Sequence, residues 1–147
     1  MATSTKKIIR ISVVALVLAA VGLGLWMWNK PHKDIKNAHA IDITAEKLYQ
    51  TFITDSAKAK TAYINQVLQV SGTVSQVSEN QQQQQIIFIN TGVTGASINC
   101  TMESKASSIK PGDQIRIKGV CSGYNSGDAD MGLPGDVFLI RGYPTNN

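Results

Sequence analysis

The sequence predicts a mainly β protein: a small five-stranded barrel, preceded by one or two short helices and by an N-terminal transmembrane helix. Three observations lead to this prediction. A long apolar stretch lies near the N-terminus, a helical pattern follows a polar linker, and five short segments of strand character fill the rest. At 147 residues the chain holds one domain plus attachments. We divide it into a basic tail (1–7), an anchor (8–28), a linker (29–42), the domain (43–143) and a short tail (144–147).

The apolar stretch Ile11–Trp28 has 18 residues and no charge, and it lengthens if Ile8 is included and Arg10 snorkels to the interface. A helix of this length spans about 27 Å, close to the hydrocarbon thickness of a bilayer. Trp26 and Trp28 stand at its end, where an aromatic belt belongs. A cleaved signal peptide is the alternative, but neither an A-x-A-like site nor a cysteine for lipid attachment follows. We therefore expect an uncleaved single-pass anchor.

The charges that flank the anchor indicate its orientation. Lys6, Lys7 and Arg10 form a tight cluster before it, whereas the three lysines that follow are diluted by Asp34. Because basic residues stay on the cytoplasmic side, we expect the domain outside, on the periplasmic side of the inner membrane. The reversed topology would place the domain in the cytoplasm and would disfavour a disulfide.

The net charge of +4 is concentrated at the N-terminus. Four of the 14 Lys and Arg residues stand at positions 6, 7, 10 and 30, and the others balance the 10 Asp and Glu residues that all come later. The chain beyond the anchor is therefore formally neutral. Phosphate binding needs a surplus of Lys and Arg, so this balance disfavours nucleic acid as a partner.

The stretch Asn29–Ala40 is polar and lacks periodicity, as expected of a linker. It holds the two histidines of the chain, His32 and His39. A metal site is the alternative to solvated side chains, but no cysteine or carboxylate cluster accompanies them. We expect neither a metal nor a cofactor.

Helical signals run from Thr44 to Ile64. Thr44 is suited to an N-cap, and Glu46 falls in the first turn, where a negative charge complements the helix dipole. An apolar stripe at helical spacing follows, consisting of Leu48, Tyr49 and Phe52. Thr54-Asp55-Ser56 indicates a break and a new cap, after which a second short helix continues. We expect both helices to pack on the barrel as a plug or lid.

Five segments have strand character, namely Gln66–Ser78, Gln85–Asn90, Ala96–Met102, Gln114–Cys121 and Asp136–Arg141. The first is long, and Gly72 in its middle removes a side chain where a strand must bend or admit a neighbour. Its apolar residues fall out of step after Val74, which predicts a bulge near 75–77. A long, bent first strand is typical of an OB-fold-like Greek-key barrel. An SH3-like barrel and an irregular β-sandwich are the alternatives.

Several of these segments together resemble a known family. The run ITAEKLYQTFITDSAKAKTAYINQVLQVSGTVSQVS, then SINCTM, PGDQIRIKGVCSGY and DVFLIRGY, is similar to the tRNA_anti-like family of bacterial OB-fold proteins. The resemblance covers about Ile43–Tyr143, mostly at apolar residues and glycines that form the fold. It implies an OB fold that often follows a membrane anchor or lipoprotein signal, without a catalytic motif, in a family largely of unassigned function. The attachment cysteine of the lipoprotein members is missing here.

Cys100 and Cys121 are the only cysteines, and both fall on the inward parity of their strands. Outside the cytoplasm such a pair suggests a disulfide, which would close a loop of about 20 residues and contribute on the order of 3 kcal/mol. Two buried free thiols are the first alternative. A redox site is the second, although the two cysteines do not form a C-x-x-C motif.

The loop 122–135 carries Asp128 and Asp130, followed by Gly132, in a D-x-D-x-G pattern. Calcium takes oxygen ligands from such loops. The EF-hand pattern fails, however, because Gly132 stands at the third ligand position and no glutamate closes the loop. Calcium is therefore the weaker interpretation, and a solvated, turn-rich loop is the stronger.

Ligands of OB folds lie across the second and third strands, between two loops that correspond here to 79–84 and 122–135. The candidate ligand-binding residues are Phe88, Arg116, Lys118 and Tyr124. Arg116 and Lys118 are more simply explained as the solvent-exposed face of a strand. Polar Gln, Asn, Ser and Thr dominate this region and suit a peptide or a sugar better than phosphate.

These observations favour a binding module over an enzyme. No nucleophile–base pair and no H-E-x-x-H, G-x-S-x-G or phosphate-loop motif occurs in the sequence. We expect a membrane-anchored extracytoplasmic OB-fold module for a protein, a peptide or an envelope oligosaccharide. A single-stranded nucleic-acid binder is one alternative, and a structural or assembly component of the cell envelope without a small ligand is another.

Overall fold

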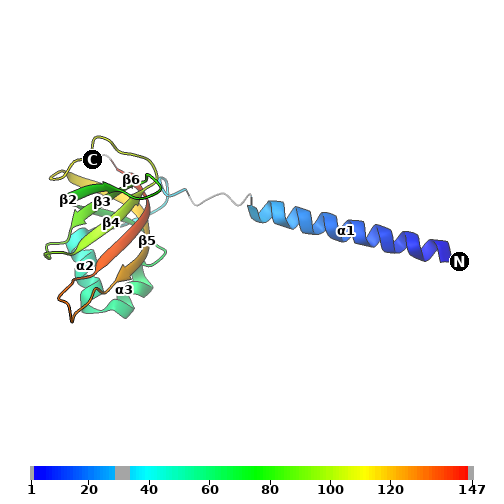
Figure 1. Ribbon diagram of the computed structural model, residues 1–147, viewed down its shortest axis with the longest axis horizontal. Coiled ribbons are helices and arrows are strands. Elements are labelled where there is room, and N and C mark those ends of the chain that lie inside the picture. Colours follow the sequence, from blue (N-terminus) through cyan, green and yellow to red (C-terminus); the bar gives the residue numbers. More distant parts are fainter. Residues whose placement is uncertain (1, 29–33, 146–147) are drawn as a thin grey trace. The chain divides into compact units, whose positions relative to one another are not determined.

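The fold is described from a computed structural model of the chain, which describes residues 2–28 and 34–145. The chain divides into two units, Met1–Asp34 and Ile35–Asn147. The first unit contains helix α1 (Ala2–Trp28), drawn in blue in Figure 1. The second contains the strands and the two remaining helices, and it begins before residue 43, where the sequence predicted the domain to start.

Helix α1 confirms the helical conformation expected of the N-terminal stretch. Its described side chains, at positions 13–25 and 27, are exposed. Among the described residues, no helix combines the length and the hydropathy that crossing a membrane requires. The side chains of residues 1–12, Trp26 and Trp28, on which part of the predicted anchor rests, lie outside the described set. The transmembrane role of residues 8–28 therefore stays a prediction.

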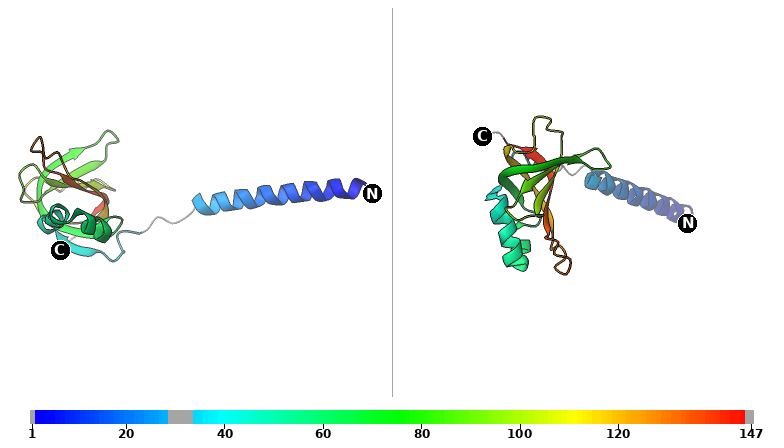
Figure 2. Two further views of the ribbon diagram at one scale, coloured as in Figure 1. Left: turned by 90° about the horizontal axis from the view of Figure 1, so that it is seen from below. Right: turned by 60° about the vertical axis from the view of Figure 1, so that its left-hand side comes forward.

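Five strands of the second unit close into a barrel. They are β2 (Val67–Glu79), β3 (Gln85–Asn90), β4 (Ser97–Met102), β5 (Gln114–Asn125) and β6 (Asp136–Pro144). Their hydrogen-bonded order is β2-β3-β4-β6-β5, and β5 pairs back with β2. Within this ring β4 and β6 are parallel, and the other neighbours are antiparallel. This is the Greek-key order of the OB fold, so the predicted barrel is confirmed (Figures 1 and 2).

Strand β2 serves two sides of the barrel because it bends. Its first half pairs with β5 and its second half with β3. The register with β3 shifts between Val74 and Gln76, which confirms the predicted bulge. At Gly72 a Cβ atom would lie 2.6 Å from Ile89 Cγ2 and 3.2 Å from Ala45 Cβ. The glycine therefore admits close neighbours from two other elements, as its place in the strand predicted.

Helices α2 (Ala45–Thr54) and α3 (Ser56–Tyr63) pack at one end of the barrel (Figures 1 and 2). The hydroxyl of Thr44 accepts a hydrogen bond from a backbone N–H of the first turn of α2 at 3.2 Å. The carboxylate of Asp55 accepts one from the first turn of α3 at 3.0 Å. Both predicted caps and the predicted break between the helices are therefore confirmed.

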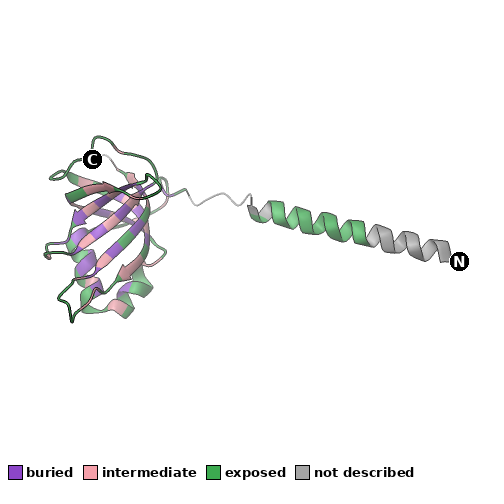
Figure 3. Cartoon of the chain, viewed as in Figure 1, coloured by how far each residue is buried: buried purple, intermediate pink, exposed green. Residues whose placement is uncertain are grey.

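The core lies inside the barrel and beneath α2, where buried side chains alternate with more exposed ones along the strands (Figure 3). The largest fully buried side chains are Phe52, Ile35, Leu48, Leu68, Ile87, Ile89, Ile98, Met102, Ile117, Leu139, Val70 and Val74. Burial of each contributes about 1.5–3 kcal/mol relative to exposure. Two of them, Leu48 and Phe52, come from α2, so this helix closes the barrel end as the predicted plug.

The end of the predicted linker packs on the barrel. Ile35 is 1% exposed, and Lys118 Nζ donates hydrogen bonds to the carbonyl oxygens of Lys36 and Ala38 at 3.0 and 3.1 Å. Strand β1 (Ile41–Thr44) follows and pairs in parallel with the first half of β2. Sequence reasoning missed β1, because four residues with a single buried side chain offer no period to detect.

Candidate functional site

The structure separates the four residues predicted to bind a ligand. Phe88 borders a groove on the outer surface of β3 and β4, whereas Arg116 and Lys118 line two other clefts. Tyr124 packs against α2. The closed barrel explains the separation, because outward side chains on different strands of a barrel point in different directions.

Tyr124 belongs to the packing between β5 and α2. Its ring stacks on Phe52 with 4.9 Å between centroids, and it meets the Tyr49 ring edge-on at 6.4 Å. Desolvation by burial, and to a smaller extent the neighbouring Tyr49, raises the pKa of the Tyr124 hydroxyl above its ordinary value. We therefore assign Tyr124 to the plug of the barrel rather than to a ligand surface.

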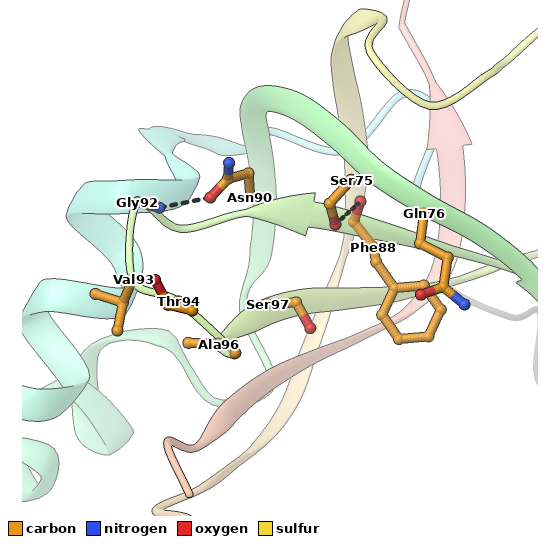
Figure 4. A pocket seen from close by; sticks show the side chains of 10 residues that line it. Ser75, Gln76, Phe88, Asn90, Gly92, Val93, Thr94, Ala96 and Ser97 are labelled. Carbon is orange, nitrogen blue, oxygen red and sulfur yellow. Dashed lines mark hydrogen bonds between the residues drawn. The ribbon is translucent and has the colours of Figure 1, made fainter.

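The groove beside Phe88 has a volume of about 430 Å³. It is lined by Ser75, Gln76, Phe88, Asn90, Gly92, Val93, Thr94, Gly95, Ala96 and Ser97, as Figure 4 shows. The bulge of β2 brings Ser75 beside β3, where its hydroxyl donates to the carbonyl oxygen of Phe88 at 3.1 Å. Sequence reasoning found Phe88 but did not find the loop residues, since the turn that curls over the strands leaves no periodic signal.

The loop between β3 and β4 has a fixed shape. The side chain of Thr91, which is 2% exposed, donates its hydroxyl proton to the carbonyl oxygen of Ala96 at 3.0 Å. Asn90 Oδ1 accepts a hydrogen bond from Gly92 N at 2.8 Å. Gly92 and Gly95 have φ angles of +77° and +83°, in the left-handed region that favours glycine. The end wall of the groove is therefore held by hydrogen bonds and backbone geometry.

A second aromatic residue lies on the same outer surface. The strand registers place Phe88 opposite Asn99, and Asn99 beside Phe138 of β6. At about 4.8 Å per strand, the two phenylalanines lie roughly 10 Å apart. Phe138 is 36% exposed, and sequence reasoning missed it although the alternation in Asp136–Arg141 places it outward. We call the groove together with Asn99 and Phe138 the aromatic face.

The aromatic face carries no positive charge. None of the residues lining the groove is ionisable. Two carboxylates lie at its border. Asp136 Oδ1 accepts a hydrogen bond from Ser97 N at 2.8 Å, and the side chain of Glu46 lies beside Gly92. Electrostatics on this face therefore disfavour an anionic ligand.

Asp128 and Asp130 stabilise a turn. Asp128 Oδ1 accepts hydrogen bonds from Asp130 N at 3.0 Å and from Met131 N at 3.2 Å, and Asp128 forms an isolated bridge with Leu133. In the described part of the chain, no three His, Cys, Asp or Glu side chains are grouped so that they could hold a metal ion. This geometry supports the turn interpretation. His39 is exposed, and His32 lies outside the described residues.

The predicted disulfide between Cys100 and Cys121 is not formed, because both are free and buried. Each lies beside Leu139 of β6, the strand that runs between theirs. Two strand spacings of about 4.8 Å separate their Cα atoms by roughly 10 Å, whereas a disulfide allows about 7 Å. Desolvation by burial raises the pKa of Cys100 to about 12. It also raises the pKa of Cys121, to about 11, against the opposing effect of a hydrogen bond with the Gly123 backbone. The alternation of side chains along the strands correctly predicted that both cysteines point inward. It did not predict that β6 lies between their strands.

The strand order, the parallel β4–β6 pair and the helical plug define an OB-fold domain. The model of the tRNA_anti-like family matches residues 1–131, and the chain belongs to this family. The match begins at the N-terminus and so includes α1, and it ends before β6. A search of curated proteins found no match.

Among solved structures, the chain is similar to one described as "a putative aspartyl-tRNA synthetase from Leishmania major Friedlin". The TM-score is 0.43 at 6% sequence identity, and the match covers 79% of this chain. It covers 22% of the synthetase chain, so the protein corresponds to about a fifth of that length. This similarity is too weak to say anything about the function of the chain.

Proposed function

We propose that this chain is a membrane-anchored, extracytoplasmic OB-fold module that binds an uncharged oligosaccharide or peptide of the cell envelope on its aromatic face. The observation that carries the proposal is the groove of about 430 Å³, whose lining combines one aromatic ring with hydroxyl and amide groups and lacks ionisable side chains. A lining of this kind suits a ligand that is bound by hydrogen bonds and by contact with a ring.

The groove offers both kinds of contact on one side of the barrel. Gln76 presents an amide that can donate and accept, Asn90 presents its NH₂ group, and the exposed Thr94 presents a hydroxyl. Phe88 provides apolar surface between them (Figure 4). A sugar ring has matching parts, with hydroxyl groups around an apolar C–H face, and a peptide in extended form offers backbone amides and side chains. Neither a sugar nor a peptide backbone needs a charged partner in the groove.

The same face argues against the nucleic-acid alternative. Single-stranded nucleic acid needs aromatic stacking together with a positively charged groove. The aromatic face supplies the rings but no Lys or Arg, and Asp136 and Glu46 lie at its borders. A phosphate backbone would therefore meet repulsion where it needs neutralisation. The anticodon-binding ancestry implied by the family name does not change this balance.

The membrane anchor is supported by the sequence of the first helix. Its 18-residue apolar stretch and the basic cluster before it are the features that give single-pass proteins an external domain. A fusion of alkaline phosphatase to the C-terminus tests the location, because the enzyme is active only outside the cytoplasm. We expect high phosphatase activity. If a reporter that is active only in the cytoplasm were active in the same position, the domain would lie inside and the proposed topology would be wrong.

The ligand is tested by NMR titration of the isotope-labelled full chain in zwitterionic micelles. Neutral oligosaccharides, extended peptides and a single-stranded oligonucleotide are added in turn at low salt. We expect amide shifts at Phe88, Asn99 and the loop 91–96 with a saccharide or a peptide. Phe88→Ala should abolish them, whereas Met131→Ala, which removes an exposed apolar side chain elsewhere, should not.

Shifts at the same residues with the oligonucleotide, fading as salt rises, would show that the fold binds nucleic acid and would overturn the proposal. Silence with all three probes would favour a structural role without a small ligand.

A further inference from the structure

A second cleft, of about 430 Å³, lies where the segment after residue 34 crosses the barrel. It is lined by Lys36, Ser104, Lys118, Tyr143, Pro144 and Thr145. An adjacent cleft shares Pro144 and Thr145 with it and contains Arg116. We call the two together the cationic cleft. It gathers three basic side chains, in contrast to the aromatic face.

Lys118 is the fixed centre of the cationic cleft. Its ammonium donates to the carbonyl oxygens of Lys36 and Ala38 at 3.0 and 3.1 Å. An ammonium group has three N–H donors, so one remains for a ligand. The barrel register sets Lys118 between Gln69 and Tyr143, and neither neighbour neutralises it. The positive charge is therefore held in place without a carboxylate partner.

The other walls of the cleft add charge and hydroxyl groups. Lys36 Nζ lies 4.9 Å from the centroid of the Tyr143 ring, a cation–π arrangement. Arg116 is exposed and forms no ion pair with any residue of the described segments. Ser104 and Thr145 bring hydroxyl groups to the lining. Ammonium, guanidinium and hydroxyl donors around a small cleft are the groups that bind a phosphate.

Carboxylates stand near the cationic cleft without lining it, among them Asp34, two residues before Lys36. Glu103 lies 3.7 Å from Arg141 Nε in an ion pair. Asp42 accepts a hydrogen bond from the Gln69 amide. No acidic residue lines the cationic cleft itself. The lining of the cleft is therefore positive although residues 31–147 together are formally neutral.

A short tether joins the segment at the cationic cleft to the predicted anchor. Seven residue steps separate Trp28, the last residue of α1, from Ile35, which is 1% exposed. Fully extended, they span at most about 25 Å. A domain of this size has a radius of gyration of about 13 Å, so its diameter exceeds the tether. Lys36, the next residue along the chain after Ile35, lines the cleft.

We infer that the cationic cleft binds the phosphate headgroup of an anionic phospholipid in the membrane that holds the anchor. The inference rests on the anchor of the proposed function and adds a lipid contact to it. Lys118 and Arg116 would donate to the phosphate oxygens, and the bound headgroup would fix the orientation of the domain. The aromatic face would then be presented at a constant angle to ligands in the envelope.

Tyrosine is a suitable probe of this contact. The chain has four tyrosines, and Tyr143 lies in the cationic cleft. Tyr63 and Tyr124 contact the Phe52 ring, and Tyr49 contacts the Tyr124 ring. Fluorotyrosine labelling of the full chain in nanodiscs therefore gives one reporter and three internal controls. The Tyr143 ¹⁹F signal should shift in discs of phosphatidylcholine with phosphatidylglycerol, and not in phosphatidylcholine alone.

Variants assign the shift to the cleft. Basic residues near an anionic surface contribute roughly 1 kcal/mol each, so Arg116→Gln should raise the anionic-lipid fraction needed for half the shift about fivefold. Lys118→Gln should act similarly or more strongly, but it also releases the segment at residues 36–38. Arg116→Gln leaves that segment intact. Lys58→Gln removes an exposed charge on α3 and should leave the midpoint unchanged.

The tryptophans separate this inference from the anchor. Both tryptophans lie at positions 26 and 28, so quenching of their fluorescence by brominated lipid reports insertion of the anchor alone. Quenching without a Tyr143 shift in anionic discs would overturn the lipid contact and leave the anchor standing. Absence of quenching would overturn both. An equal Tyr143 shift with inorganic phosphate in neutral discs would overturn the lipid as occupant in favour of a free anion.

Discussion

The aromatic face and the cationic cleft lie on one small barrel, yet they differ in chemistry. The groove of the aromatic face is lined by ten residues without an ionisable side chain. The cationic cleft collects Lys36, Lys118 and Arg116. Summed over residues 31–147, charges of both signs cancel. A net charge of zero therefore describes neither surface, and a charge argument about a ligand has to be made for each surface separately.

The topology of the barrel produces this difference. Phe88 of β3 and Phe138 of β6 lie on one surface, on either side of β4, whereas Arg116 and Lys118 of β5 lie beside β2 on another. Alternation in the sequence identifies Arg116 and Lys118 as outward, but it does not say toward which side of a closed barrel they point. The sequence prediction therefore grouped them with Phe88, and the structure separates them.

The largest expected effect concerns the core that both surfaces share. Phe52 is fully buried and stacks on Tyr124, so Phe52→Ala should cost about 3–5 kcal/mol of the free energy of unfolding. Urea denaturation followed by circular dichroism measures this loss. The truncation should weaken ligand binding at both surfaces together. Loss of binding at one surface with full binding at the other would mean that the two surfaces do not depend on the same barrel core.

The thiols report on the same core. With pKa values of about 12 and 11 for Cys100 and Cys121, against an ordinary value of 9.0, the thiolate fraction of the folded protein near pH 8 is lowered at least about a hundredfold. Labelling by a disulfide reagent should therefore be slow in buffer and should reach both thiols in urea. Prior treatment with a reductant should change neither result, because no bond joins the two cysteines.

The raised thiol pKa values also predict a pH dependence of stability. Because the pKa of each thiol is raised in the folded state, the unfolded chain releases the thiol proton at a lower pH than the folded chain does. The contribution of the buried thiols to the free energy of unfolding is therefore present below pH 9 and is lost as the pH rises toward 11 and 12. The midpoint of urea unfolding should fall across this window. A double Cys→Ala variant that still folds should lack this part of the fall.

The two surfaces should be separable by single substitutions. Phe88→Ala removes the ring from the groove and should weaken saccharide or peptide binding about tenfold, as expected for an aromatic contact at the centre of an interface. It should leave the Tyr143 response to anionic lipid unchanged. Arg116→Gln should have the reverse pattern, with about a fivefold effect on the lipid response.

The double variant sharpens this comparison. Sites without shared partners add within about 0.5 kcal/mol, so Phe88→Ala with Arg116→Gln should show both losses and no coupling between them. A coupling larger than that would indicate that lipid binding and ligand binding act on each other.

The sequence predicted the scaffold well because its signals are local. Alternation identified the five strands, Thr44 and Asp55 marked the helix starts, and Gly72 with the change of step after Val74 located the bend. The contents of the sites depend on which strands are neighbours. The position of Leu139 between the cysteines, the row from Phe88 to Phe138, and the contact of Lys118 with residues 36 and 38 all follow from closure of the barrel.

The smallest expected effect lies outside both surfaces, at the turn of Asp128. Its carboxylate accepts two backbone hydrogen bonds in the turn, so Asp128→Ala should cost about 0.5–1.5 kcal/mol, in the range of one net hydrogen bond. Millimolar calcium should shift the melting temperature of neither the original chain nor this variant, because no three acidic, histidine or cysteine side chains of the described residues are grouped around the turn. A calcium-dependent rise that Asp128→Ala removes would restore the calcium interpretation. Asp128 itself lines neither the groove nor the cationic cleft, although a Cβ on Gly95 of the groove would lie 3.1 Å from Pro134 Cγ of the same loop. The variant should leave the Tyr143 response intact, and it is the stability control for that response.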